Sequence, residues 1–191
     1  MFFSILLIAH FQAVVIPFIF GINSINQFKN IKNYSLIPFG FIFFGLASMF
    51  EMLDHTQTYW IYVNHSSFLN WLFYSFLSLG LTFLSISVLK NKLILTTNIC
   101  ISFCSIISYF LFDKTITILF QMILSIFLII NWQKFFKDWL FFLYPIFGIF
   151  FTTFFGTNLS TSGDQFCHIF IGPSGTISVL TFYLVLKRSY K

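Results

Sequence analysis

The stretch FFSILLIAHFQAVVIPFIFG, from Phe2 to Gly21, decides the fold class of this chain. It holds no Asp, Glu, Lys or Arg, and it has the length of roughly 20 residues that a helix needs to cross the core of a bilayer. No positively charged segment precedes it, and the apolar run is longer than that of a signal peptide. We therefore expect a retained transmembrane helix.

The rest of the 191-residue chain has a similar composition, with 58% hydrophobic and 8% charged residues and a mean hydropathy of +0.91. A water-soluble domain would need far more polar residues to cover its surface. The segments also lack the alternation of a transmembrane barrel. We predict one domain, 1–191, that is all-α: an integral membrane bundle of seven transmembrane helices. The predicted spans are 2–22, 36–54, 69–89, 93–112, 115–131, 139–156 and 166–186.

The basic residues predict the orientation of this bundle. Nine of the ten Lys and Arg residues follow an odd-numbered span, and Lys114 is the exception. The positive-inside rule then places the N-terminus outside and the C-terminus in the cytoplasm. Four Trp residues are predicted to form interfacial belts, Trp60 and Trp71 outside and Trp132 and Trp139 inside. The nine basic residues are Lys29, Lys32, Lys90, Lys92, Lys134, Lys137, Lys187, Arg188 and Lys191.

The net charge of +5 does not indicate a nucleic-acid partner, because the basic residues stand singly or in pairs between apolar runs. The expected surroundings are membrane lipids, in a bacterial plasma membrane or a thylakoid-type membrane. The sequence leaves the oligomeric state open. Cys100, Cys104 and Cys167 are expected to be small buried residues and not a disulfide framework.

Two acid–histidine pairs stand near the outer ends of predicted spans. Glu51 and His55 end span two, and Asp164 and His168 begin span seven. Residues four apart share one face of a helix. Because the two spans run in opposite directions, both pairs lie at the same predicted depth, with Asp54 nearby. If the helices are neighbours, two imidazoles and several carboxylates converge.

Such a group of side chains is typical of a zinc site. Two imidazoles and a carboxylate can hold zinc and leave a fourth position to water, so His55, Asp164 and His168 are the predicted metal ligands. Glu51 or Asp54 would then orient the water or take its proton. Charged groups in a membrane are expensive and commonly mark functional sites.

Three other interpretations use the same residues. In the first, His55 and His168 are axial ligands of haem b in a haem-binding or electron-transfer protein. In the second, the protein is not an enzyme and the polar residues merely cap helices, as an acid at a helix N-terminus stabilises it by about 0.3–1 kcal/mol. In the third, the carboxylates carry protons or ions.

Other polar residues suggest structural roles. His10 stands alone in span one and is expected to be packed or hydrogen-bonded within the bundle. Gln121 is expected to form a hydrogen bond to a neighbouring helix. Gly172 and Gly175, on either side of Pro173, are expected to allow close approach between helices.

The seven spans and the two polar pairs together resemble the alkaline ceramidase-like membrane hydrolases. In that family a Ser-x3-His ends the second span, an Asp follows soon after, and a His-x3-His lies in the last span, around zinc. The Asp has no match in this chain. Here Glu51 stands in place of the Ser and Asp164 in place of the first His, while His55 and His168 match. The resemblance implies a membrane-embedded metal-dependent hydrolase that acts on a lipid amide or ester. The predicted orientation would place its site on the outer, periplasmic or lumenal side.

The topology can be tested with reporter fusions. A reporter that is active only in the cytoplasm should be active when fused after Lys191, because the nine basic residues that follow odd-numbered spans predict that this end faces the cytoplasm. Activity of a reporter that works only in the outer compartment would contradict the predicted orientation.

The zinc hypothesis predicts the metal content of the purified protein. Replacing His55 or His168 by Gln should abolish bound metal, because an amide is a poor zinc ligand, whereas His10→Gln should leave it unchanged. Elemental analysis is the measurement, and a wild-type protein without stoichiometric metal would end the zinc interpretation.

Overall fold

The computed structural model describes residues 2–57, 67–112, 114–162 and 165–190. Within these ranges, the side chains of residues 2–3, 55–57, 67, 159–162, 165 and 168 are not described. The described residues are helical and include no strand, and seven segments are long and apolar enough to cross a membrane. The predicted all-α class and seven spans are therefore confirmed.

The predicted spans match the observed helices closely. The sixth span is composite, because a short 3-10 turn and a π-helical turn precede its α-helix. The elements are α1 (Phe2–Ser24), η1 (Tyr34–Leu36), α2 (Ile37–Gln57), α3 (Ser67–Ser87), α4 (Lys92–Leu111), α5 (Lys114–Phe136), η2 (Trp139–Phe142), η3 (Pro145–Phe151), α6 (Thr152–Ser162) and α7 (Gln165–Ser189).

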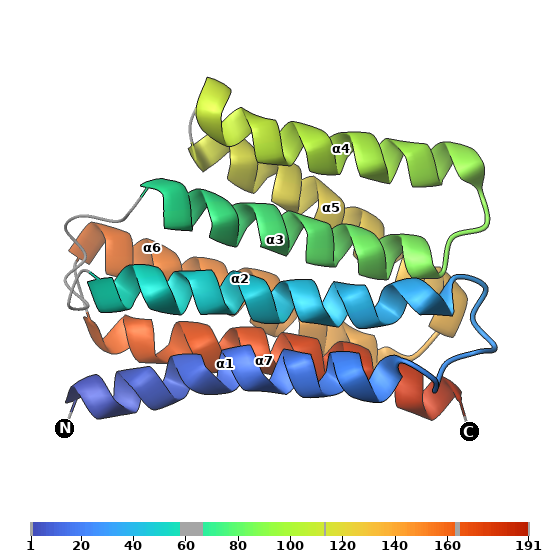
Figure 1. The fold of residues 1–191 in the computed structure, drawn as a ribbon, viewed down its shortest axis with the longest axis horizontal. Coiled ribbons are helices and arrows are strands. Elements are labelled where there is room, and N and C mark those ends of the chain that lie inside the picture. Colours follow the sequence, from blue (N-terminus) through green and yellow to red (C-terminus); the bar gives the residue numbers. More distant parts are fainter. Residues whose placement is uncertain (1, 58–66, 113, 163–164, 191) are drawn as a thin grey trace.

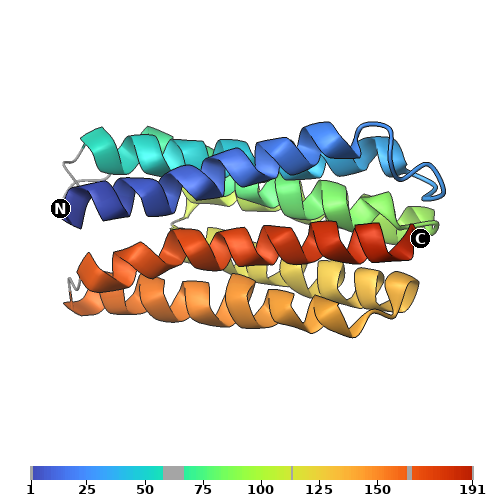
Figure 2. The same cartoon turned by 90° about the horizontal axis from the view of Figure 1, so that it is seen from below.

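The helices run up and down along one common direction, and the two chain ends lie at opposite ends of the bundle (Figure 1). Helix α1 packs against α2 and α7, α2 against α3, and α6 against α7. Helices α3, α4 and α5 form a second group in contact with one another. Figure 2 shows α6 and α7 side by side, on the opposite side of the bundle from α2.

Hydrogen bonds between side chains hold α3, α4 and α5 together. Ser78 and Ser105 hydroxyls lie 2.8 Å apart, and the Asn131 amide donates to Ser85 at 3.0 Å. The Gln121 amide donates to the Tyr74 carbonyl at 2.8 Å, which confirms the expected bond to a neighbouring helix. Because lipid offers these groups no partner, bonds of this kind favour association of the helices.

Two expectations about burial are wrong. Trp132 is fully buried and donates a 2.7 Å hydrogen bond to the Leu84 carbonyl, so it belongs to the core and not to an interfacial belt. Cys100 and Cys104 are exposed on the outside of α4. A thiol is apolar enough to face lipid, so hydropathy alone did not distinguish a core position from a lipid-facing one.

Gly172 allows α7 to approach α1 closely. A Cβ atom at this position would lie 2.4 Å from the backbone oxygen of Ala9, a distance that no real side chain adopts. A Cβ atom at Gly175, one turn further on, would meet nothing within 4 Å. The expected close approach is therefore confirmed for Gly172 and is wrong for Gly175, which faces open space.

These two glycines give a matched pair of substitutions. Gly172→Ala should destabilise the protein by about 1–3 kcal/mol, because the α1 backbone must move away. Gly175→Ala should be neutral or slightly stabilising, since alanine has the higher helix propensity. Thermal unfolding in detergent, followed by circular dichroism, measures both, and equal effects would contradict the close contact of α1 and α7.

Candidate functional site

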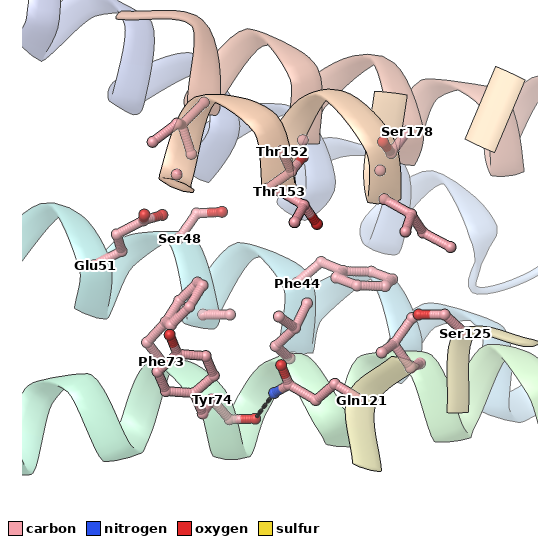
Figure 3. Close-up of a pocket in the computed structure, with 18 of the residues that line it drawn as sticks. Phe44, Ser48, Glu51, Phe73, Tyr74, Gln121, Ser125, Thr152, Thr153 and Ser178 are labelled. Carbon is pink, nitrogen blue, oxygen red and sulfur yellow. Dashed lines mark hydrogen bonds between the residues drawn. The ribbon is translucent and has the colours of Figure 1, made fainter. Parts of the chain in front are cut away.

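A cavity of about 400 Å³ lies inside the bundle between helices that are far apart in the sequence. Helices α2, α3, α5, α6 and α7 supply nearly all of its walls, together with the π-helical turn η3 (Figure 3). Most of the surface that lines the cavity is apolar, but polar side chains also project into it from several helices. The polar side chains are Ser48, Glu51, Asp54, Asn70, Tyr74, Lys114, Gln121, Ser125, Tyr144, Thr152, Thr153, Thr157 and Ser178.

Aromatic residues occupy the C-terminal end of the cavity, meaning the end nearer the C-terminus of the chain. The rings of Phe44 and Phe182 are stacked with their centroids 6.1 Å apart and so join α2 to α7. The Tyr144 hydroxyl donates a 2.9 Å hydrogen bond to Ser125, which ties α5 to the start of the sixth span. Together these contacts separate the cavity from the C-terminal end of the bundle.

Glu51 is the carboxylate that projects from α2 into this cavity. Its side chain lies on the same wall as Ser48 and faces the side of the cavity that holds Thr152 and Thr153 (Figure 3). Within the described part of the chain, no side chain forms a hydrogen bond or an ion pair with its carboxylate. A carboxylate in this position is costly unless something pairs with it.

Asp54 lies one turn further along α2 and is more deeply buried, at 2% exposure. The Asn70 amide nitrogen is 3.5 Å from its carboxylate, which is a long contact. The other polar atom of Asn70, Oδ1, is buried and accepts no hydrogen bond from any described residue. The N-terminal half of the cavity therefore contains two acids and one amide oxygen that has no hydrogen-bond partner among the described residues.

Sequence reasoning missed the wall formed by the sixth span. The π-helical turn at Pro145–Phe151 brings Gly148 against Tyr144 and Ser178, where a Cβ atom would lie 2.7 Å from each side chain. Thr152 bonds back to the Phe147 carbonyl at 2.9 Å, five residues earlier. The sequence feature that could have indicated this wall was the pair Thr152–Thr153 within a Phe-rich span that also contains Pro145 and Gly148. π-turns are frequent at functional sites.

The structure brings Glu51 and Asp54 into one cavity, as expected from their spacing on α2. Asp164 and the side chains of His55 and His168 lie outside the described residues, so the convergence of the two pairs stays a prediction. Among the described residues, no group of three His, Cys, Asp or Glu side chains could hold a metal ion. His10 is buried in α1, with Nδ1 3.0 Å from the Leu6 carbonyl, as expected.

The arrangement can bind an apolar molecule that carries one polar group. Apolar side chains at the C-terminal end would surround its hydrocarbon part. Glu51, with Ser48, Thr152 and Thr153 nearby, would face its polar group. This is the usual composition of a small-molecule site, in which a few placed polar groups fix the orientation of a ligand held by apolar walls.

One family model matches the chain over residues 1–191, and its description is "Seven transmembrane receptor". No curated protein matches the chain at a significant level. No solved structure does so either.

The family match corrects the resemblance to alkaline ceramidases, which is wrong: no hydrolase family is indicated. The resemblance depended on polar pairs spaced four residues apart. Such a pair shows that two side chains share a helix face, but it does not show which helix they meet. Glu51 and Asp164, which replace two residues of the ceramidase pattern, and the lack of the family's Asp after span two were the signal against it.

Proposed function

The chain belongs to the seven-transmembrane receptor family, and from this premise we propose that it is a non-enzymatic receptor for an apolar amine. The ligand would lie in the cavity between α2, α3, α5, α6 and α7, with its ammonium group against Glu51. This proposal agrees with the interpretation in which the protein is not an enzyme, and it gives Glu51 a role in binding in place of a catalytic one.

The observation that carries the proposal is the Glu51 carboxylate, which faces the cavity without a partner among the described residues. An isolated charge away from water is destabilising, whereas a hydrogen-bonded ion pair offsets much of that cost. A ligand ammonium group would supply both the opposite charge and the hydrogen-bond donors. The family description supports ligand binding in general, and Glu51 supports a cationic ligand in particular.

The other charges of the cavity also favour a cation. Asp54 adds a second acid beside Glu51, while the cationic side chain among the described lining residues, Lys114, is exposed at the N-terminal edge. A cation deep in the cavity would therefore meet more negative than positive charge. An anionic ligand would be repelled by the two acids.

The size of the cavity suits a small ligand. Its volume of about 400 Å³ falls at the lower end of the roughly 300–1,000 Å³ that is typical of ligand sites. Gly156 and Gly175 both line it, and a Cβ atom at either would meet nothing within 4 Å. Small residues at these positions leave room that a larger side chain would fill.

Zinc, haem b and hydrolysis of a lipid amide or ester have no support from the family match, and the receptor proposal requires none of them. The ligand set His55, Asp164 and His168 stays a prediction, to be tested by elemental analysis. The predicted orientation would place Glu51 toward the outer side of the membrane.

Photoaffinity labelling tests the receptor proposal. The probe is decylamine with a diazirine in its alkyl chain, applied to the protein in lipid nanodiscs, and mass spectrometry locates the labelled residues. We expect labelling on cavity-lining segments of α2, α6 and α7. Glu51→Gln should weaken binding roughly 10- to 100-fold, because a hydrogen bond to a charged group contributes about 1.5–3 kcal/mol.

Two controls make this result specific. Asp138→Asn removes an acid at the C-terminal end of the bundle, where it pairs with Arg188 at 3.2 Å, and should leave binding unchanged. The matching probe with an alcohol in place of the amine should bind more weakly and lose little on Glu51→Gln. Labelling that is confined to lipid-facing residues, or that Glu51→Gln does not reduce, would overturn the proposal.

A further inference from the structure

We propose that the ligand reaches the cavity from within the bilayer, through a lateral portal between α5 and α6. This inference rests on the proposed binding function, because it concerns how that same cavity is filled. It narrows the ligand class to amphiphilic amines that partition into the membrane. The portal is formed by Met122 of α5 together with Thr153 and Thr157 of α6.

Helices α5 and α6 separate toward the N-terminal end of the bundle. The sixth span (η2, η3 and α6) lies close to α5 at the C-terminal end of the bundle, where η2 follows α5 in the chain. The two spans diverge from there, so that α6 lies apart from α5 in both views (Figures 1 and 2). Among the described residues, α5 packs on α3 and α4 and α6 packs on α7, while α5 and α6 do not pack against each other along their length.

The residues on either side of this separation line the cavity and also reach the surface. Met122 lines the cavity and is 37% exposed, and Thr153 and Thr157 line it and are exposed as well. A residue that contributes to both surfaces marks a place where the cavity opens. Met122 lies in the first half of α5, and Thr153 and Thr157 lie in the second half of the sixth span. Because the two spans run in opposite directions, all three residues lie between the middle and the N-terminal end of the bundle, and this opening lies along its side.

The surface around the opening is apolar. Leu119 on α5 is 51% exposed and Phe154 on α6 is 50% exposed, and neither lines the cavity. In a membrane-spanning bundle, such residues contact the acyl chains of lipids. The opening therefore faces hydrocarbon, and the molecules that meet it are those already dissolved in the bilayer.

The neighbouring helix pairs are closed by tight packing. Gly21 and Gly45 bring α1 and α2 together, Gly40 and Gly80 do the same for α2 and α3, and Gly172 does so for α1 and α7. At the C-terminal end, the bond from Tyr144 to Ser125 joins α5 to the sixth span. Among the described helix pairs that border the cavity, α5 and α6 thus offer the least obstructed path.

The portal also fits the chemistry of the proposed ligand. An amphiphilic amine lies in a bilayer with its chain in the hydrocarbon and its head group near the interface. Thr153 is exposed and lines the cavity, and the hydroxyl groups of Thr152 and Ser48 line it together with Glu51 (Figure 3). These groups would offer hydrogen bonds to the amine along its path.

Time-resolved labelling tests the portal. Donor vesicles loaded with the decylamine diazirine probe are mixed with proteoliposomes of the full chain, and samples are irradiated at successive times. In the double variant Met122→Trp and Thr153→Trp, uptake and release should both slow by about tenfold or more, which corresponds to a barrier higher by about 1.4 kcal/mol. Because both rates fall together, occupancy at long times should change much less than the rates.

The matched control is the double variant Leu119→Trp and Phe154→Trp, which adds the same indole rings on the same helices outside the cavity and should keep wild-type rates. Unchanged rates in the Met122 and Thr153 variant, with normal occupancy, would overturn the portal and leave the binding site intact. Lower occupancy at unchanged rates of uptake would also overturn it. Absence of cavity labelling in the wild type would instead refute the proposed function.

Discussion

The structure depends on one constraint: a polar group inside a bilayer must find its partner within the protein, because lipid offers none. Helices α3, α4 and α5 meet this constraint with a set of interhelical hydrogen bonds, such as those of Ser78 to Ser105 and Asn131 to Ser85. Elsewhere the helices are held together by close backbone packing, as where Gly172 of α7 lies against the Ala9 backbone of α1. Glu51 departs from this pattern, since none of the described residues pairs with it. A bound cation would supply the missing partner.

The membrane spans could be predicted from the sequence, because the length and apolar character of a span are local properties. Every predicted span overlaps an observed membrane-length helix. The hydrogen bond of Gln121 was also foreseeable, since an amide in the middle of a span has few alternatives. Which helices are neighbours was not foreseeable, because it depends on side-chain packing between segments far apart in the sequence. The buried Trp132 and the exposed Cys100 show this directly, as hydropathy treats both sides of a membrane helix alike.

The candidate site could be predicted in part. Glu51 stood out as an acid inside an apolar run, and the structure places it in the cavity together with Asp54. Thr152, Thr153 and the π-helical turn were missed, because hydroxyl groups in a span usually bond to their own helix and carry little signal. The seven spans and the two acid–histidine pairs suggested a hydrolase, and the family match over the whole chain places the chain in a seven-transmembrane receptor family instead. The spacing of two residues on one helix shows only that they share a face of that helix, whereas a binding site is formed by side chains from several helices.

The central claim is that the Glu51 carboxylate, which has no partner among the described residues, binds the amine of a ligand. The most direct measurement is an experimental structure of the protein in lipid nanodiscs with decylamine, at a resolution that shows the side chains of the cavity. The account predicts that the amine nitrogen lies within hydrogen-bond distance of the Glu51 carboxylate and that the alkyl chain points toward Phe44 and Phe182. A Glu51 carboxylate that pairs with His55 or His168 instead, beside a cavity filled by protein side chains, would contradict it.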